Sequence, residues 1–227
     1  MSAADLSVVM PAYNTEAYAG EAIASVLAGA DRLLELIVVD DGSTDATAAI
    51  AASFGDPVRV IRQENRGAAG ARNTALAAAR GTYLGFLDSD DIWVAGRPDP
   101  RLELLDANPE VAGVGGSCRF FVAGAYGSRT IVLDPMTAAE MGAVILRRTV
   151  LDTVPGFDEQ FAIAEDVDFL ARIGEAGLRI DTIDTLTFLD RLRPGSLTRD
   201  RDAVLKGWLQ AGRMAMKRAR EREADAG

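Results

Sequence analysis

The side chains best suited to chemistry in this sequence are carboxylates that follow short apolar runs. Asp88, Asp90 and Asp91 come directly after the apolar residues 84–87, so that three carboxylates fall within four positions. Like charges this close repel one another unless a cation lies between them. A divalent ion that bridges them to a diphosphate would remove the repulsion. An acidic turn that caps the next helix explains the same residues without a ligand, and both interpretations stay open at this point.

A second acidic pair, Asp40 and Asp41, follows the apolar residues 36–39 and precedes Gly42. Glycine permits a tight turn here, and the polar residues after it can cap a helix. One of the two carboxylates, directed into a crevice, could accept a hydrogen bond from the imide N–H of uracil or thymine. The pair therefore indicates a pyrimidine nucleotide as one candidate ligand.

Asn65, Gly67 and Arg72 stand at the start of a predicted helix. A helix N-terminus favours anions, and Arg72 could reach a phosphate group. Small residues that allow a helix to pack closely on a sheet explain the glycine equally well. Far along the chain, Glu165 and Asp166 begin another predicted helix. Acids are favoured in a first helical turn for structural reasons alone, so these two also have more than one explanation.

Composition removes several kinds of chemistry. The 227 residues contain no histidine and one cysteine, Cys118, which excludes Ser-His-Asp triads, histidine-bound zinc and an internal disulfide. Any bound metal should then be a hard ion held by oxygen, and we expect Mg²⁺ or Mn²⁺. The net charge of −10 makes nucleic acid an unsuitable partner, although it does not exclude a nucleotide.

The first ninety residues alternate between strand and helix patterns. Strands are predicted at residues 6–10, 34–39, 58–63 and 83–87, with helices at 15–30, about 43–53 and 67–80. This rhythm predicts a doubly wound, mostly parallel sheet, in which ligands bind at the carboxyl ends of the strands. Because the polar segments above lie at those ends, we expect them to converge on one crevice.

The pattern after residue 91 is less regular. Helices are predicted at residues 98–107, 165–175 and 200–222, and strands at 111–122, 129–133 and 143–146. Trp93 and Trp208 are interpreted as packing residues. The basic stretch in the last helix is typical of a solvated face, with contact to a membrane surface as a minority interpretation. Without a signal peptide or a spanning segment, we expect a cytoplasmic protein.

The motifs, taken in order, resemble the family 2 inverting glycosyltransferases with the GT-A fold. The resemblance runs from Ser7 to about Arg199. Its five segments are an opening strand at residues 8–14, a nucleotide-binding turn at 37–45, a loop and helix at 65–73, a DXD region at 86–93, and an acidic motif at 156–159 with 165–166. Five such segments in the correct order make the similarity specific.

The resemblance implies a role for each matching position. The donor nucleotide sugar would be bound by Pro11, Ala12, Tyr13, Asn14, Asp40, Asp41, Asn65, Gly67, Arg72, Asp88, Ser89 and Arg193. Asp90 and Asp88 would hold Mg²⁺ or Mn²⁺. Asp166 would be the general base, with Glu165 as the second candidate. Arg193 stands where family members often carry a histidine; a guanidinium group cannot ligate a cation, but it can bind phosphate.

The resemblance also implies an architecture and a reaction. Residues 1–200 would form one α/β domain of GT-A type. Its Rossmann-like nucleotide-binding half would span 1–95 and its smaller, mixed acceptor half 96–200, followed by a C-terminal helix and tail at 201–227. The reaction would be a single, non-processive, metal-assisted transfer from a UDP- or dTDP-sugar, with inversion.

Several points stay open at the level of sequence. The acceptor is unidentified and could be a glycan, a lipid-linked sugar, a peptide or protein, or a small molecule. The main alternative function is a catalytically weak or inactive nucleotide-sugar-binding subunit. A nucleotidyltransferase is a weaker alternative, because no basic triphosphate loop is present near the N-terminus. A homodimer and peripheral membrane contact are also open.

Overall fold

The computed structural model describes residues 5–94, 96–123, 129–131, 140–193 and 201–225, and the statements below refer to these. The strands are β1 (Leu6–Ala12), β2 (Leu33–Asp40), β3 (Val58–Arg62), β4 (Tyr83–Phe86), β5 (Ile92–Trp93), β6 (Val111–Ala123), β7 (Arg129–Ile131), β8 (Val144–Arg147) and β9 (Arg179–Arg191). The α-helices are α1 (Ala19–Gly29), α2 (Thr47–Ala52), α3 (Gly67–Ala78), α4 (Pro100–Ala107), α5 (Glu165–Glu175) and α6 (Arg201–Asp225), and short 3₁₀ helices span Met141–Ala143 and Arg148–Asp152.

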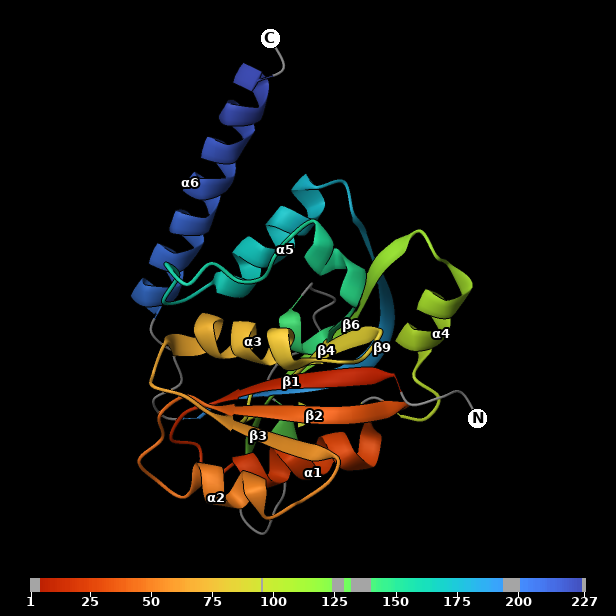
Figure 1. Ribbon diagram of the computed structural model, residues 1–227, viewed down its shortest axis with the longest axis vertical. Coiled ribbons are helices and arrows are strands. Elements are labelled where there is room, and N and C mark those ends of the chain that lie inside the picture. Colours follow the sequence, from red (N-terminus) through yellow and green to blue (C-terminus); the bar gives the residue numbers. More distant parts are fainter. Residues whose placement is uncertain (1–4, 95, 124–128, 132–139, 194–200, 226–227) are drawn as a thin grey trace.

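The first half of the chain forms the parallel sheet that the sequence predicts. Its strands lie in the order β3-β2-β1-β4, and each neighbouring pair is parallel. Successive side chains of β1 point to opposite faces, as the strand period of two requires. Val8 packs in the cluster that includes α1, while Val9 packs with α3 and α5. Figure 1 shows α1 and α2 on one side of this sheet and α3 on the other.

The helix predicted from residue 15 begins at Ala19 instead. The preceding residues form a turn in which the Thr15 carbonyl accepts from the Tyr18 amide, at 2.8 Å. The Thr15 amide is itself bound by the hydroxyl of Thr47, at 2.8 Å, so the backbone after β1 is fixed to α2 before the helix starts. This turn keeps the residues at the end of β1 free of helical structure.

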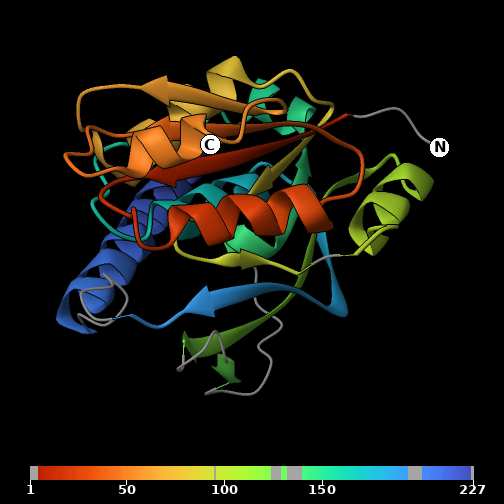
Figure 2. The same cartoon turned by 90° about the horizontal axis from the view of Figure 1, so that it is seen from below.

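The second half mixes strand directions. β8 is antiparallel to β4 and to β6, β9 is parallel to β6, and β5 is antiparallel to β9. The sequence did not predict β9, the partner of β6 along most of its length. Its first half contains Asp181 and Asp184 and is largely exposed, so no apolar run identifies it. Figure 2 shows β9 and the β6–β7 hairpin on the side of the molecule away from β3.

The last helix, α6, packs on α5 and extends beyond the rest of the chain at one end (Figure 1). The contact is ionic toward its C-terminal part. Arg218 binds the fully buried Asp168 at 2.8 Å and Glu175 at 2.8 Å, and Arg222 also binds Glu175. Within the described residues, no helix combines the length and apolar character needed to span a membrane.

A fully buried ion pair supports the end of β5. Arg101 and Asp99 are both inaccessible to solvent and bind each other at 2.7 Å. Arg101 also donates to the carbonyl of Ala143 at 2.8 Å and lies over the ring of Trp93, 4.7 Å from its centre. Trp93 is buried, as predicted. The pair therefore joins α4, β5 and the segment before β8.

We predict that Asp99→Ala strongly destabilises the fold. Removing one partner of a buried ion pair leaves the other charge uncompensated and typically costs about 3–5 kcal/mol. Asp181→Ala is the matched control, because the pair between Asp181 and Arg179 lies at the surface and should barely change the melting temperature. Chemical denaturation of both variants measures the difference. Equal, small effects of the two substitutions would contradict the structural role of Asp99.

Candidate functional site

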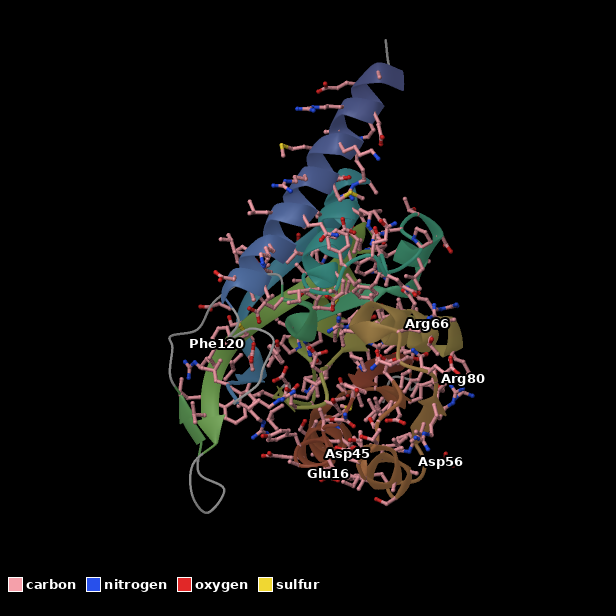
Figure 3. The ribbon with its side chains drawn as sticks, turned by 90° about the vertical axis from the view of Figure 1, so that its left-hand side faces the viewer. Glu16, Asp45, Asp56, Arg66, Arg80 and Phe120 are labelled. Atoms are coloured by element: carbon pink, nitrogen blue, oxygen red, sulfur yellow. The ribbon has the colours of Figure 1, made fainter. Side chains whose placement is uncertain are left out.

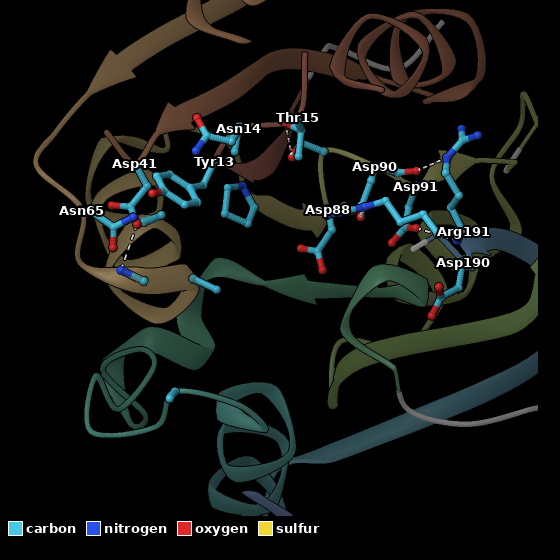
Figure 4. A pocket seen from close by; sticks show the side chains of 18 residues that line it. Tyr13, Asn14, Thr15, Asp41, Asn65, Asp88, Asp90, Asp91, Asp190 and Arg191 are labelled. Carbon is cyan, nitrogen blue, oxygen red and sulfur yellow. Dashed lines mark hydrogen bonds and ion pairs between the residues drawn. The ribbon is translucent and has the colours of Figure 1, made fainter. Parts of the chain in front are cut away.

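A cleft of ≈ 630 Å³ opens at the carboxyl ends of the parallel strands (Figure 4). This volume is within the range of pockets that bind small molecules. It is lined by eleven of the predicted site residues, namely Pro11, Ala12, Tyr13, Asn14, Asp41, Asn65, Gly67, Asp88, Ser89, Asp90 and Arg193. The remaining lining residues are Thr15, Ala68, Ala71, Asp91, Ala162, Asp190 and Arg191. The expected convergence of distant polar segments on one crevice is therefore present.

The loops after β1, β2 and β4 are bonded to one another around the cleft. Asn14 has a left-handed backbone (φ 49°), which asparagine tolerates better than most residues. Its amide donates to the hydroxyl of Ser43, and its side-chain oxygen accepts from the amide of Thr44. The hydroxyls of Thr15 and Ser89 are 2.9 Å apart. Close by, the Glu16 amide donates to Asp45, and these two residues lie next to each other in Figure 3.

Asp41 holds the start of α3 while facing the cleft. One of its oxygens accepts from the Gln63 side chain and the Arg66 amide, and the other accepts from the Gly67 amide at 2.8 Å. A carboxylate has about four acceptor positions, so about one is left for a ligand. Gly42 makes this arrangement compact, because its φ is 82° and a side chain there would meet the Asn65 amide at 3.1 Å.

Asp40 does not line the cleft. It is fully buried, and its Oδ2 accepts from Arg62 at 2.8 Å. Its Oδ1 has no hydrogen-bond partner among the described residues. This geometry favours a structural role for Asp40 over the predicted contact with the nucleotide.

Arg72 lies behind the cleft and connects two parts of the predicted site. Its Nη2 binds Asp88 at 2.6 Å, and its Nη1 binds Glu165. Only 6% of the Arg72 side chain is exposed, so it is positioned to neutralise these carboxylates more than to contact a ligand in the open cleft. Burial raises the pKa of Glu165, with Arg72 acting in the opposite direction and Asp166 adding to the increase.

Two further arginines, both from the end of β9 or just after it, stabilise the acidic turn at residues 88–91. Arg193 Nε binds Asp90 at 2.5 Å. Arg191 is buried; its backbone amide donates to Asp91 and its Nε to the backbone carbonyl of Asp90. The turn is therefore fixed by groups about one hundred residues away in sequence.

The donor set suits a hard divalent cation only in part. Among the described residues, no group of three or more Asp, Glu, Cys or His side chains is arranged to hold a metal. Asp88 and Asp90 provide two carboxylates at the cleft. Mg²⁺ is commonly bound by one or two carboxylates together with substrate phosphates. The residues therefore fit a cation whose coordination is completed by a diphosphate.

Two acids that the sequence analysis did not select lie close to this turn. Burial, with the charges of Glu140, Asp88 and Asp90, raises the pKa of Asp190 to about 7. Burial also raises the pKa of Glu140; its hydrogen bond from Cys118 opposes this, and the charges of Asp166 and Asp88 add to it. Only the fold brings Asp190 and Glu140 here, because both lie outside the motifs. Asp190 follows an apolar pair in an unpredicted strand, which is the one signal the sequence offers.

Asp166 lies at the start of α5, outside the residues that line the cleft. It is half-buried, and one of its oxygens accepts from the amide of Val167. Its charge acts on Arg72, Glu165 and Glu140, so it is close to the group of carboxylates behind the cleft. The other carboxylate oxygen has no hydrogen-bond partner within the described part of the chain.

Comparison with known proteins places the chain among glycosyltransferases. The model of the family described as glycosyl transferase family 2 matches residues 7–158. A UDP-Glc:alpha-D-GlcNAc-diphosphoundecaprenol beta-1,3-glucosyltransferase from Escherichia coli, WfgD, is 41% identical over 105 residues, which cover 45% of this chain and 42% of the relative. This stretch is under half of either protein.

Two solved structures share the fold. S. aureus TarS 1–349 in complex with UDP-GlcNAc has a TM-score of 0.72 at 24% identity, covering 86% of this chain and 61% of that one. The mannosyltransferase PcManGT from Pyrobaculum calidifontis, in complex with GDP-Man and Mn²⁺, has a TM-score of 0.74 at 21% identity, covering 96% and 65%. The matched region thus spans less than two thirds of each of the three proteins compared, and the α/β architecture is of GT-A type.

We predict that Asp190→Asn raises thermal stability at pH 8 but has little effect near pH 4. An ordinary aspartate has a pKa of 3.8, so the folded protein binds this proton more tightly than the unfolded chain. The stabilising contribution of the protonated carboxyl is therefore complete below about pH 4 and is lost as the pH rises through about 7. Asparagine removes that loss, which for a pKa of about 7 against 3.8 is on the order of 4 kcal/mol.

The measurement is the melting temperature of both proteins in EDTA across this pH range. Asp152→Asn, at an exposed position, is the control and should give the same difference at every pH. If the melting temperatures of Asp190→Asn and the unsubstituted protein also differed by the same amount at every pH, the neighbouring acids would not perturb the carboxyl of Asp190.

Proposed function

The chain belongs to glycosyl transferase family 2, and on this premise we propose that it transfers a sugar from a nucleotide-diphosphate sugar to an acceptor hydroxyl, with inversion at the anomeric carbon. The observation that carries the proposal is the cleft at the strand ends, which is lined by eleven of the predicted site residues. The carboxylates of Glu165 and Asp166 lie behind it, and both are within electrostatic reach of Arg72.

We propose a uridine or thymidine donor. Tyr13 lines the cleft with half of its surface exposed, which suits stacking of a base on its ring. Asp41 retains about one acceptor position for an imide N–H, a group that uracil and thymine have. The names of the E. coli relative and of the TarS complex contain UDP-sugars, whereas the PcManGT complex contains GDP-Man.

Asp90 and Asp88 would hold Mg²⁺ or Mn²⁺ together with the donor diphosphate. When bound, the cation supplies positive charge that stabilises the departing diphosphate. Arg193 binds Asp90 and lines the cleft, so it can also donate hydrogen bonds to a phosphate. In this proposal the arginine and the metal share the neutralisation of the leaving group.

Asp166 is the proposed general base. The carboxylate oxygen that has no hydrogen-bond partner among the described residues accepts the proton of the acceptor hydroxyl as the acceptor oxygen bonds to the anomeric carbon. The bond from that carbon to the diphosphate breaks in the same step, and the diphosphate leaves with the electron pair. Glu165 is less suitable, because it is buried and already bound to Arg72. We assign it to positioning Arg72.

The proposed division of labour follows the two halves of the chain. Residues 1–95 would bind the donor, 96–200 the acceptor, and 201–227 would form an appended helix and tail. The cleft draws on both halves, because Ala162, Asp190, Arg191 and Arg193 complete its lining. For the acceptor we propose a lipid-linked sugar as the first class to test, since the name of the E. coli relative specifies one.

The alternative is a nucleotide-sugar-binding subunit with weak or no activity. One observation favours it: both predicted metal-binding carboxylates already contact an arginine, Asp88 through Arg72 and Asp90 through Arg193. Such a protein would bind a nucleotide and yet show no turnover with any acceptor or with water.

We predict that Asp166→Asn lowers the rate of donor hydrolysis or sugar transfer about 10²–10⁴-fold, the usual contribution of a general base. Nucleotide binding should not change, because Asp166 does not line the cleft. Glu165→Gln is the matched variant and should reduce the rate less, while lowering stability through the loss of the Arg72 ion pair. Full turnover by Asp166→Asn would exclude it as the base.

We predict that UDP or dTDP binds more tightly than GDP in calorimetric titrations with Mn²⁺, and that EDTA weakens but does not abolish binding. Arg193→Ala should then weaken binding in EDTA by about tenfold or more, because a charge-assisted hydrogen bond contributes about 1.5–3 kcal/mol. Arg148→Ala, at an exposed arginine directly after β8, is the control. Absence of nucleotide binding in every condition would contradict the proposed site.

A further inference from the structure

We propose that the exposed face of α6 binds the surface of an anionic phospholipid membrane. The face consists of Leu205, Trp208, Leu209 and Met216, flanked by the basic residues Lys206, Arg213, Lys217 and Arg220; we call the whole set the α6 face. Trp208 is not the packing residue that the sequence predicts, because 60% of its surface is exposed.

The apolar residues form a stripe on one side of the helix, with three of them close together and Met216 two turns further on. Their spacing places them on one side of the helix: Leu205 is three residues before Trp208 and four before Leu209, and Met216 is seven residues after Leu209. Each of the four is more than half exposed. Figure 3 shows α6 rising from the body of the molecule with side chains projecting into open space along its length. An exposed stripe of large apolar side chains of this kind marks an interaction site.

The opposite side of α6 is already used. Ala211 is buried, and a side chain at Gly207 would come within 2.8 Å of the Ile163 carbonyl. Arg218 and Arg222 bind α5 from this side. The packing fixes the rotation of the helix, so the α6 face is directed away from the body.

The charge beside the stripe selects the partner. The chain has a net charge of −10, yet the basic residues of the α6 face gather along one edge of the stripe. Lys206, Arg213 and Arg220 form no ion pair with another described residue. Leucine and tryptophan beside lysine and arginine is the composition of helices that lie in the membrane interface. Each basic residue near an anionic surface contributes to the attraction.

A second copy of this chain suits the α6 face less well. Two such helices packed stripe to stripe in antiparallel directions would bring their basic edges to the same side, where like charges repel, and packing in parallel directions would leave both basic edges without an opposite charge. An anionic lipid surface satisfies the apolar and the basic residues at once.

The position of the α6 face relative to the cleft adds a functional reason. Gly207 lies against the carbonyl of Ile163, the residue after Ala162, which lines the cleft. Asp166 is three residues further along. A membrane bound at the α6 face would therefore be separated by the width of α6 from the segment that leads to the proposed base. A lipid-linked acceptor would be presented beside this helix, and that last step alone rests on the proposed function.

The test is binding of the full chain to vesicles by sedimentation and by tryptophan fluorescence, without donor or acceptor. We expect the chain to bind vesicles of phosphatidylglycerol mixed with phosphatidylcholine. Binding should weaken as the salt concentration rises from about 50 to about 500 mM, because salt screens the charges and the Debye length is already roughly 10 Å at 0.1 M. Binding should move Trp208 emission to the blue. Trp93 is buried beside Arg101 and should not respond. Trp208→Phe should therefore lose the spectral change while still sedimenting.

Arg213→Glu should weaken sedimentation about tenfold, since it removes one attractive charge and adds a repulsive one. Arg148→Glu makes the same charge change at an exposed position outside α6 and should have no effect. Three results would overturn the proposal. They are equal binding to vesicles of pure phosphatidylcholine, no binding to anionic vesicles, and equal effects of Arg213→Glu and Arg148→Glu on sedimentation. Self-association that Trp208→Glu abolishes would assign the α6 face to a second copy instead. Because no nucleotide is present, these outcomes are independent of the transferase assay.

Discussion

Repulsion among the carboxylates at the end of β4 is the constraint on which the rest of the site depends. Asp88, Asp90 and Asp91 would not stay together in a low-dielectric cleft without compensating charge. The fold supplies it from two arginines, Arg72 from α3 and Arg193 just beyond β9. Arg191 of β9 adds hydrogen bonds to the turn from its backbone amide and its Nε. The acidic turn is thus stable only once the two halves of the sheet have come together.

This dependence explains why the second half of the sheet has its mixed topology. β9 runs beside β6 and delivers Arg191 to the acidic turn, while β5 pairs with β9 directly after that turn. The buried pair of Asp99 and Arg101 then supports Trp93 from the other side. The irregular region is therefore the support of the cleft, and the regular parallel half provides its lining loops.

The parallel half and most of its cleft residues were predictable, because apolar runs, turn residues and polar strand ends are local signals. Eleven predicted residues do line the cleft. Features that depend on distant partners were not predictable. β9 has no apolar run, and Asp40 differs from Asp41 only in which side of the strand end it faces. Trp208 was misjudged because sequence pattern does not reveal which side of α6 is covered by α5.

The bridging position of Arg72 has a consequence for how the two ends of the site are coupled. One guanidinium contacts Asp88, beside the proposed donor diphosphate, and Glu165, adjacent in sequence to the proposed base. A ligand that draws Asp88 toward itself changes the charge balance felt by Glu165 and, through it, by the first turn of α5. In the proposed function, the donor site and the start of α5 thus share one buried guanidinium group, so that binding at either would alter the charge balance at the other.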